Sequence, residues 1–83
     1  MALRWYNLKV GDFIKVKFYG KDKSLSDIVI CKVVSTDKDS ILAKDYDKIY
    51  RLWATGYGGY EGITIFKYKI FHSSESEFLI GGV

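Results

Sequence analysis

The chain has no proline, a single cysteine, a single histidine and no long hydrophobic run. Cys31 alone cannot form an intramolecular disulfide, so we expect a reducing location such as the cytoplasm. No apolar run approaches the ~18 residues that a membrane-spanning helix needs. The first residues also lack the apolar segment of a signal peptide. We therefore expect no membrane partner.

The same scarcity limits the chemistry that the chain can perform. Cys31 and His72 are too few for a usual zinc site, which takes four ligands. His72 lies beside serines and is expected in a solvated turn, whereas Cys31 lies in the most apolar run, so a Cys–His catalytic pair is disfavoured. The glycines at 56–62 lack the Lys-Ser/Thr that follows a phosphate-binding loop. We expect a binding protein without enzyme activity, cofactor or metal, although the spacing of the ten acids neither selects nor excludes a carboxylate pair.

What the chain does contain is typical of one small β-domain spanning residues 1–83. Hydrophobic residues make up 48% and aromatic residues 17%, which favours a folded core and strands. A chain of 83 residues has a thin core with little room for a deep cavity. The net charge of +3 comes from the first forty residues, and it permits anionic partners without requiring them.

Alternating and β-branched runs predict five or six short strands. The run at 27–36 is expected to be covered on both faces. The stretch 46–55 is ambiguous, because Tyr46, Ile49, Tyr50 and Trp53 also fit one face of a short helix. The expected extended segments are 13–19, 27–36, 41–44, 49–53, 63–71 and 77–80.

Short strands at about ten-residue spacing predict an antiparallel sandwich or barrel, and closure into a small barrel removes exposed edges. Leu8-Lys9-Val10-Gly11-Asp12, with a β-run and a turn at 37–40 after it, resembles the first half of SH3-like small barrels. This resemblance covers about half of the chain, rests on turns and apolar runs, and implies the all-β barrel fold.

Two predicted strands each carry a Lys-x-Lys pair beside aromatic residues. In a strand, alternate residues share a face. One face therefore carries Phe13, Lys15, Lys17 and Tyr19, and another carries Ile65, Lys67, Lys69 and Phe71. The opposite faces, Ile14/Val16/Phe18 and Thr64/Phe66/Tyr68/Ile70, are the expected core.

Such faces have two interpretations. Outward lysines keep small barrels soluble and protect strand edges. Lysines interleaved with rings also suit single-stranded nucleic acid, whose phosphates pair with ammonium groups and whose bases stack on rings. An acidic protein surface is a further possible partner. If the two strands are neighbours, four lysines lie close together, and their repulsion favours an anionic partner.

The glycine-rich stretch 55–62 is expected to be a flexible loop that presents Tyr57 and Tyr60. Tyrosine and glycine mixtures make adaptable contacts in binding loops. The alternative function is thus a protein-interaction module, an inhibitor or adaptor, that uses this loop and exposed aromatics. Richness in Lys, Ile, Tyr and Asp is compatible with a viral or mobile-element origin.

Overall fold

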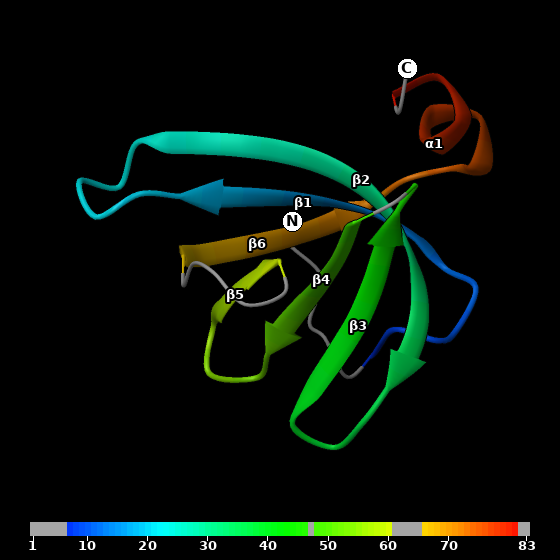
Figure 1. Ribbon diagram of the computed structural model, residues 1–83, viewed down its shortest axis with the longest axis horizontal. Helices are drawn as coiled ribbons and strands as arrows, with labels where there is room; N and C mark the ends of the chain where they lie inside the picture. Colours follow the sequence, from blue (N-terminus) through cyan, green and yellow to red (C-terminus); the bar gives the residue numbers. More distant parts are fainter. Residues whose placement is uncertain (1–6, 47, 61–65, 82–83) are drawn as a thin grey trace.

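The protein folds as a closed antiparallel barrel in which each strand pairs with the next and the last pairs with the first (Figure 1). The computed structural model describes residues 7–46, 48–60 and 66–81. The predicted all-β small barrel is confirmed, whereas its resemblance to SH3-like barrels stays a prediction. Its elements are β1 (Phe13–Tyr19), β2 (Leu25–Thr36), β3 (Ser40–Asp45), β4 (Lys48–Trp53), β5 (Tyr57–Tyr60), β6 (Phe66–His72) and α1 (Glu75–Gly81).

Alternation along β1 gives the barrel its inside and its outside. Ile14, Val16 and Phe18 are buried, and the residues between them are partly exposed. The inward residues of the other strands complete one core, with Phe66 and Tyr68 of β6 packed against it. The buried core residues are Leu8, Ile14, Val16, Phe18, Val29, Cys31, Val33, Ile41, Ala43, Tyr50, Leu52 and Ile70. The predicted faces of β1, and of β6 from Phe66 onward, are confirmed, whereas Thr64 and Ile65 lie outside the described residues.

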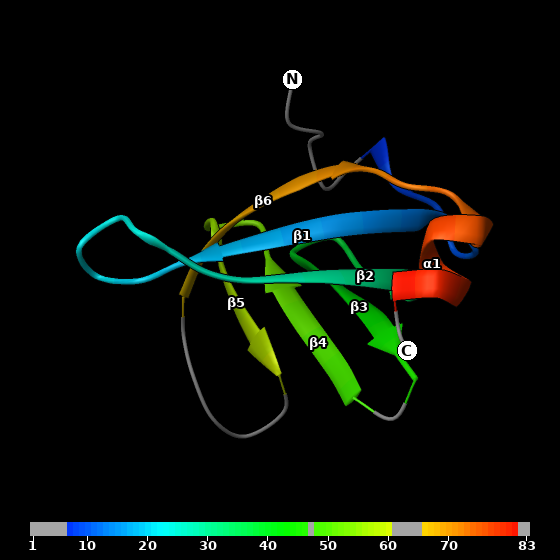
Figure 2. The same ribbon diagram turned by 90° about the horizontal axis from the view of Figure 1, so that it is seen from above.

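β1 lies between β2 and β6 and pairs with both along its length (Figure 2). Gly11 begins this arrangement with a φ of 98°, which its missing side chain permits, and its N–H bonds Val33 O at 2.8 Å. Asp12 closes the turn, because its carboxylate accepts the Lys9 N–H at 2.9 Å. The turn therefore fixes where β1 starts against β2.

Residues 48–53 form strand β4, not a helix. β4 alternates between exposed and buried positions, and its inward residues are Tyr50 and Leu52. The turn beginning at Tyr46, whose φ is 48°, returns the chain so that β4 pairs with β3 along its whole length. This pairing satisfies the backbone of both strands, which a lone helical turn would not do.

Residues Tyr57–Tyr60 form strand β5, so the expectation of a flexible loop over 55–62 is wrong for these four residues. Gly58 is buried, and a Cβ at this position would stand 2.6 Å from Leu52 Cδ2 and 2.8 Å from Arg51 O. The glycine therefore serves close approach of β5 to β4, a recognised role of glycine inside strands. Residues 61 and 62 lie outside the described part.

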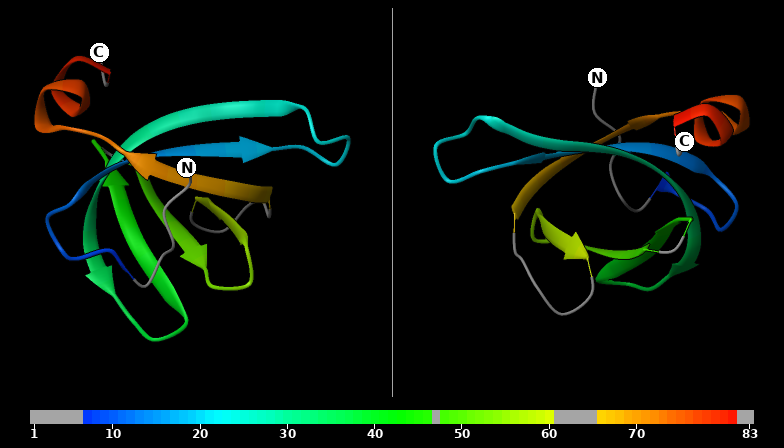
Figure 3. Two further views of the ribbon diagram at one scale, coloured as in Figure 1. Left: turned by 180° about the vertical axis from the view of Figure 1, so that it is seen from behind. Right: turned by 45° about the horizontal axis from the view of Figure 1, so that its top comes forward.

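The C-terminal segment is a helix, so the predicted strand at 77–80 is wrong. Ser74 caps α1, because its Oγ accepts the Glu77 N–H at 3.2 Å. Ser74 and Glu77 have the spacing of a capping box, and Glu75 and Glu77 suit the first helical turn. The helix lies across one end of the barrel, beside the start of β1 (Figure 3). The part of the chain that the structure describes contains no helix long and apolar enough to cross a membrane.

β2 is covered on one face only, which corrects the expectation of two covered faces. Val29, Cys31 and Val33 point inward, but Ile28 and Val34 are 45% and 42% exposed. Helix α1 packs against part of β2, but its seven residues leave Ile28 and Val34 uncovered. The outer side of β2 thus extends the surface that begins on β1.

Cys31 should react slowly with thiol reagents in the folded protein. Its exposed fraction is 0%, and burial, with the Asp45 carboxylate, raises the pKa of the thiol far above its ordinary value. Because the thiolate is the reactive form, labelling should proceed through opening of the barrel. Comparing labelling rates with and without denaturant measures this, and rapid labelling under native conditions would contradict the buried position.

Replacing Gly58 with alanine should destabilise the barrel by about 1–3 kcal/mol, because the added methyl group meets Leu52 and the Arg51 carbonyl. Gly20→Ala is the matched control, since its Cβ would approach nothing closer than the Asp22 carboxylate at 3.3 Å. Urea unfolding of both variants measures the difference. Equal stability of the two would show that β5 does not approach β4 as described.

Candidate functional site

The two Lys-x-Lys strands are direct neighbours in the barrel. In the antiparallel pairing of β1 with β6, Lys17 stands opposite Lys69, Lys15 opposite Phe71 and Tyr19 opposite Lys67. The two Lys-x-Lys strands are therefore neighbours, as the sequence-based argument for an anionic partner required. Ile65 lies outside the described residues. We call the outward residues of β1 and β6, with those of β2 and β3 beside them, the lysine face.

The opposed lysines Lys17 and Lys69 lean apart along the strands. Lys17 Nζ lies 4.8 Å from the centroid of the Phe71 ring, and Lys69 Nζ lies 5.8 Å from that of Tyr19. Phe71 and Tyr19 are on opposite sides of the Lys17–Lys69 pair in the register. Each ammonium thus moves away from the other while gaining a cation–π contact of about 0.5–1 kcal/mol. These contacts reduce the repulsion without removing either charge from the surface.

The lysine face extends beyond the residues that the sequence indicated. Lys32 of β2 pairs with Lys44 of β3, which is a second pair of like charges facing each other. Lys32 also pairs with Phe13, and its Nζ lies 5.8 Å from that ring. Lys32 could have been found from sequence, because buried Cys31 and Val33 on either side leave it outward. It was missed because the run was taken as covered on both faces.

Charge is concentrated on this face. Its six lysines carry twice the net charge of the chain, so the remainder of the chain is net negative. Neither β1 nor β6 contains an aspartate or glutamate. The members of the set are Lys15, Lys17, Lys32, Lys44, Lys67 and Lys69.

Helix α1 occupies one end of the lysine face. Phe78 packs on Phe13 with ring centroids 5.3 Å apart, and Glu77 Oε2 lies 3.4 Å from Lys15 Nζ. Phe13 is therefore partly covered by the helix, and its role in contacting a partner stays a prediction. Both members of the Lys15–Glu77 pair are partly exposed, so this ion pair stabilises little.

The other end of the lysine face opens into a groove of about 470 Å³. Three lysines and two outward tyrosines line it, and no aspartate or glutamate of the described residues does. Tyr68 forms part of its wall and donates a hydroxyl hydrogen bond to Trp53 O. Burial raises the pKa of the Tyr68 hydroxyl to about 12. The lining consists of Tyr19, Lys23, Thr55, Gly56, Tyr57, Lys67, Tyr68 and Lys69. We call it the basic groove.

The two tyrosines of β5 serve different places. Tyr57 pairs with Lys67 and lines the basic groove, whereas Tyr60 pairs with Tyr50 and lines a separate hollow at the mouth of the barrel. Their exposed fractions are similar, 41% and 39%. The predicted single tyrosine loop is thus two separate aromatic positions on one strand.

The thiol and the imidazole are held apart. Cys31 and His72 pair with the same residue, Ile14, from its two sides, so strand β1 lies between them. Two strand spacings separate their backbones, or about 9.5 Å. Among the residues that the structure describes, no three His, Cys, Asp or Glu side chains gather into a metal-binding group.

Comparison with known proteins adds no assignment to this geometry. No protein-family model matches the chain, and neither does a curated protein or a solved structure.

Proposed function

We propose that the protein is a non-catalytic module that binds single-stranded nucleic acid on its lysine face. The observation that supports this most directly is the position of Lys17 opposite Lys69 on strands that contain no acid. Rings flank the ammonium groups on both strands, with Phe13 and Tyr19 on either side of the β1 lysines and Phe71 beside Lys69. Single strands require rings and cations together. A location in the cytoplasm belongs to the same proposal.

The energetics favour an anionic partner. A pair of like charges directly opposite each other costs roughly 0.2–1 kcal/mol, and the lysine face has two such pairs, Lys17–Lys69 and Lys32–Lys44. A glutamate at one position of either pair would turn the repulsion into attraction. A phosphate that binds between the two ammonium groups likewise turns their repulsion into attraction, and it releases bound counterions.

The cation–π contacts suggest how a strand is bound. In the free protein Lys17 covers the Phe71 ring and Lys69 covers the Tyr19 ring. A phosphate draws the ammonium off the ring, and the freed ring is then available to stack on a base. The basic groove is the natural place for one nucleotide, with Tyr57 as a stacking ring and Lys23 beside it.

A protein-interaction module remains the second candidate. Trp53 is an exposed large aromatic on β4, and the Arg51 guanidinium lies 5.2 Å from its ring. Arginine and tryptophan are enriched where protein interfaces concentrate their binding energy. This pair lies outside the lysine face, so mutations can separate binding of an acidic protein or adaptor from binding of a nucleic acid.

Binding of a single-stranded oligonucleotide should weaken as salt rises, with a log–log slope of about −0.7 for each phosphate neutralised. Lys17→Ala and Lys69→Ala should each reduce the slope by about one contact, with little dependence on base sequence. Lys38→Ala removes the same charge from the exposed turn after β2 and is the matched control. Fluorescence anisotropy over a salt series measures all four proteins.

The absence of binding at about 50 mM salt, where the electrostatic contribution is large, would eliminate this function. Equal loss in Lys17→Ala and Lys38→Ala would indicate attraction to overall charge instead of the lysine face. In either case the Arg51–Trp53 surface becomes the leading candidate.

Charge reversal should separate stability from binding. Lys17→Glu replaces the repulsion with Lys69 by attraction but loses the Lys17–Phe71 cation–π contact, so the free energy of unfolding should change by less than about 1 kcal/mol. The same change should lower affinity for nucleic acid more than Lys17→Ala does, because it adds repulsion from phosphate. Urea unfolding and anisotropy on one sample measure both effects. A variant that loses stability and retains binding would refute the role given to the pair.

A further inference from the structure

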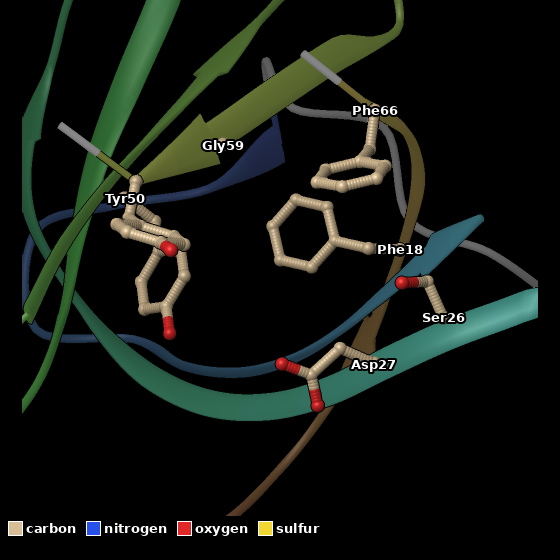
Figure 4. A pocket seen from close by; sticks show the side chains of 7 residues that line it. Phe18, Ser26, Asp27, Tyr50, Gly59 and Phe66 are labelled. Carbon is tan, nitrogen blue, oxygen red and sulfur yellow. The ribbon is translucent and has the colours of Figure 1, made fainter. Parts of the chain in front are cut away.

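The mouth of the barrel holds a half-open hollow of about 210 Å³ with a different character from the lysine face. Four aromatic side chains line it, together with one carboxylate. Figure 4 shows Phe18 and Phe66 on one side of the space, Tyr50 on another and the Asp27 carboxylate below them. The lining residues are Phe18, Ser26, Asp27, Tyr50, Gly59, Tyr60 and Phe66. We call it the aromatic hollow.

The rings of the aromatic hollow hold one another in place. The Phe18 centroid lies 5.7 Å from that of Tyr50 and 6.2 Å from that of Phe66, and Tyr60 meets Tyr50 edge to face at 5.9 Å. Four different strands, β1, β4, β5 and β6, contribute these rings. Such a set is fixed by barrel closure before any ligand arrives, so little ordering is needed on binding.

Charge in the aromatic hollow is negative. Among the described residues, no lysine or arginine lines it and none forms a salt bridge with Asp27. Asp27 Oδ1 accepts the Ile28 N–H at 2.9 Å, which fixes the direction of the carboxylate. Burial raises the pKa of Tyr50 to about 12, and Cys31, Asp45 and Asp27 also act on it in the same direction. A phosphate is therefore unsuited to this hollow, whereas a cation gains from both the carboxylate and the ring faces.

The size and the lining narrow the kind of cation. The volume is below the roughly 300–1,000 Å³ of sites for drug-sized ligands, so the occupant is a small group. A bare ammonium has three N–H donors that need acceptors, and the lining is mostly ring. An alkylated ammonium needs none, and aromatic cages bind it well. Tyr60 already attracts one cation from outside the hollow, since Lys48 Nζ lies 5.6 Å from its centroid.

We propose that the aromatic hollow binds a quaternary ammonium group, carried by a trimethylated lysine side chain or by choline, with Phe18, Tyr50, Tyr60 and Phe66 around the methyl groups and Asp27 facing the charge. This site is independent of the nucleic-acid function proposed above, because it shares no lining residue with the basic groove.

The test compares choline with 3,3-dimethyl-1-butanol, which has the same shape without the charge, by amide chemical shifts in the intact protein. Choline should shift the signals of Asp27, Gly59 and Tyr60 with about millimolar affinity, and the neutral alcohol should bind at least several-fold more weakly. Equal shifts from both compounds, or choline shifts spread over the whole barrel, would overturn the proposal.

Two pairs of variants locate the binding. Tyr60→Leu should weaken choline binding by about tenfold, and Tyr57→Leu, equally exposed on the same strand, should leave it unchanged. Asp27→Asn should also weaken it by about tenfold, whereas Asp37→Asn should not. Asp37 is a matched control because its Oδ1 accepts the next backbone N–H in the same way. Unchanged choline binding in Asp27→Asn would overturn the proposal.

Three further ligands identify the source. A peptide containing trimethyllysine that binds more tightly than choline, with no binding of the unmethylated peptide, would support a modified protein as the partner. Tighter binding of choline would support a free or lipid-borne headgroup. A nucleoside that displaces choline at lower concentration would overturn the proposal and assign the hollow to a base.

Discussion

The pairing of β1 with β6 is the constraint on which both surfaces depend. It closes the barrel, so that each described strand pairs with two neighbours over at least part of its length. The same register places Lys17 opposite Lys69 on the outside and brings Phe18 beside Phe66 on the inside. A shift of one residue would exchange inward and outward side chains and would remove both arrangements together.

The period of two along β1 places the two proposed sites, of opposite charge, on the two sides of one strand. Lys17 and Tyr19 point outward to the lysine face and the basic groove, while Phe18 between them points into the aromatic hollow. The chain therefore needs no separate element for each site. The wall of the barrel is one residue thick, so neighbouring residues face the two proposed sites on its two sides.

Much of the fold followed from the sequence. The alternation of 13–19 predicted β1 and both of its faces, and the β-branched run predicted β2. Local patterns left a choice where two of them competed: 46–55 fits a helix by spacing as well as the expected strand at 49–53, and pairing with β3 makes 48–53 a strand. The Ser74–Glu77 capping box was present and outweighed the β-propensity of the residues after it.

The candidate site was only half predictable for a related reason. Outward lysines on β1 and β6 follow from alternation, but their adjacency is a property of barrel closure, which no local pattern encodes. Position 58 needs a glycine because a side chain there would meet Leu52 on the neighbouring strand β4. No local sequence pattern indicates this contact. The aromatic hollow was not predicted at all, because its rings come from four strands and each ring alone is ordinary core.

Closure through the first and last strands also governs when these surfaces come into being. β1 is synthesised early, but its partner β6 is the last strand of the barrel to leave the ribosome. Contacts between distant parts of a chain are slow to form and depend on the whole chain being available. A nascent chain that ends before β6 presents the lysines of β1 without their opposing lysines and the ring of Phe18 without Phe66. Neither surface is complete on a partly made molecule, so the proposed ligands could be bound only once β6 has been synthesised.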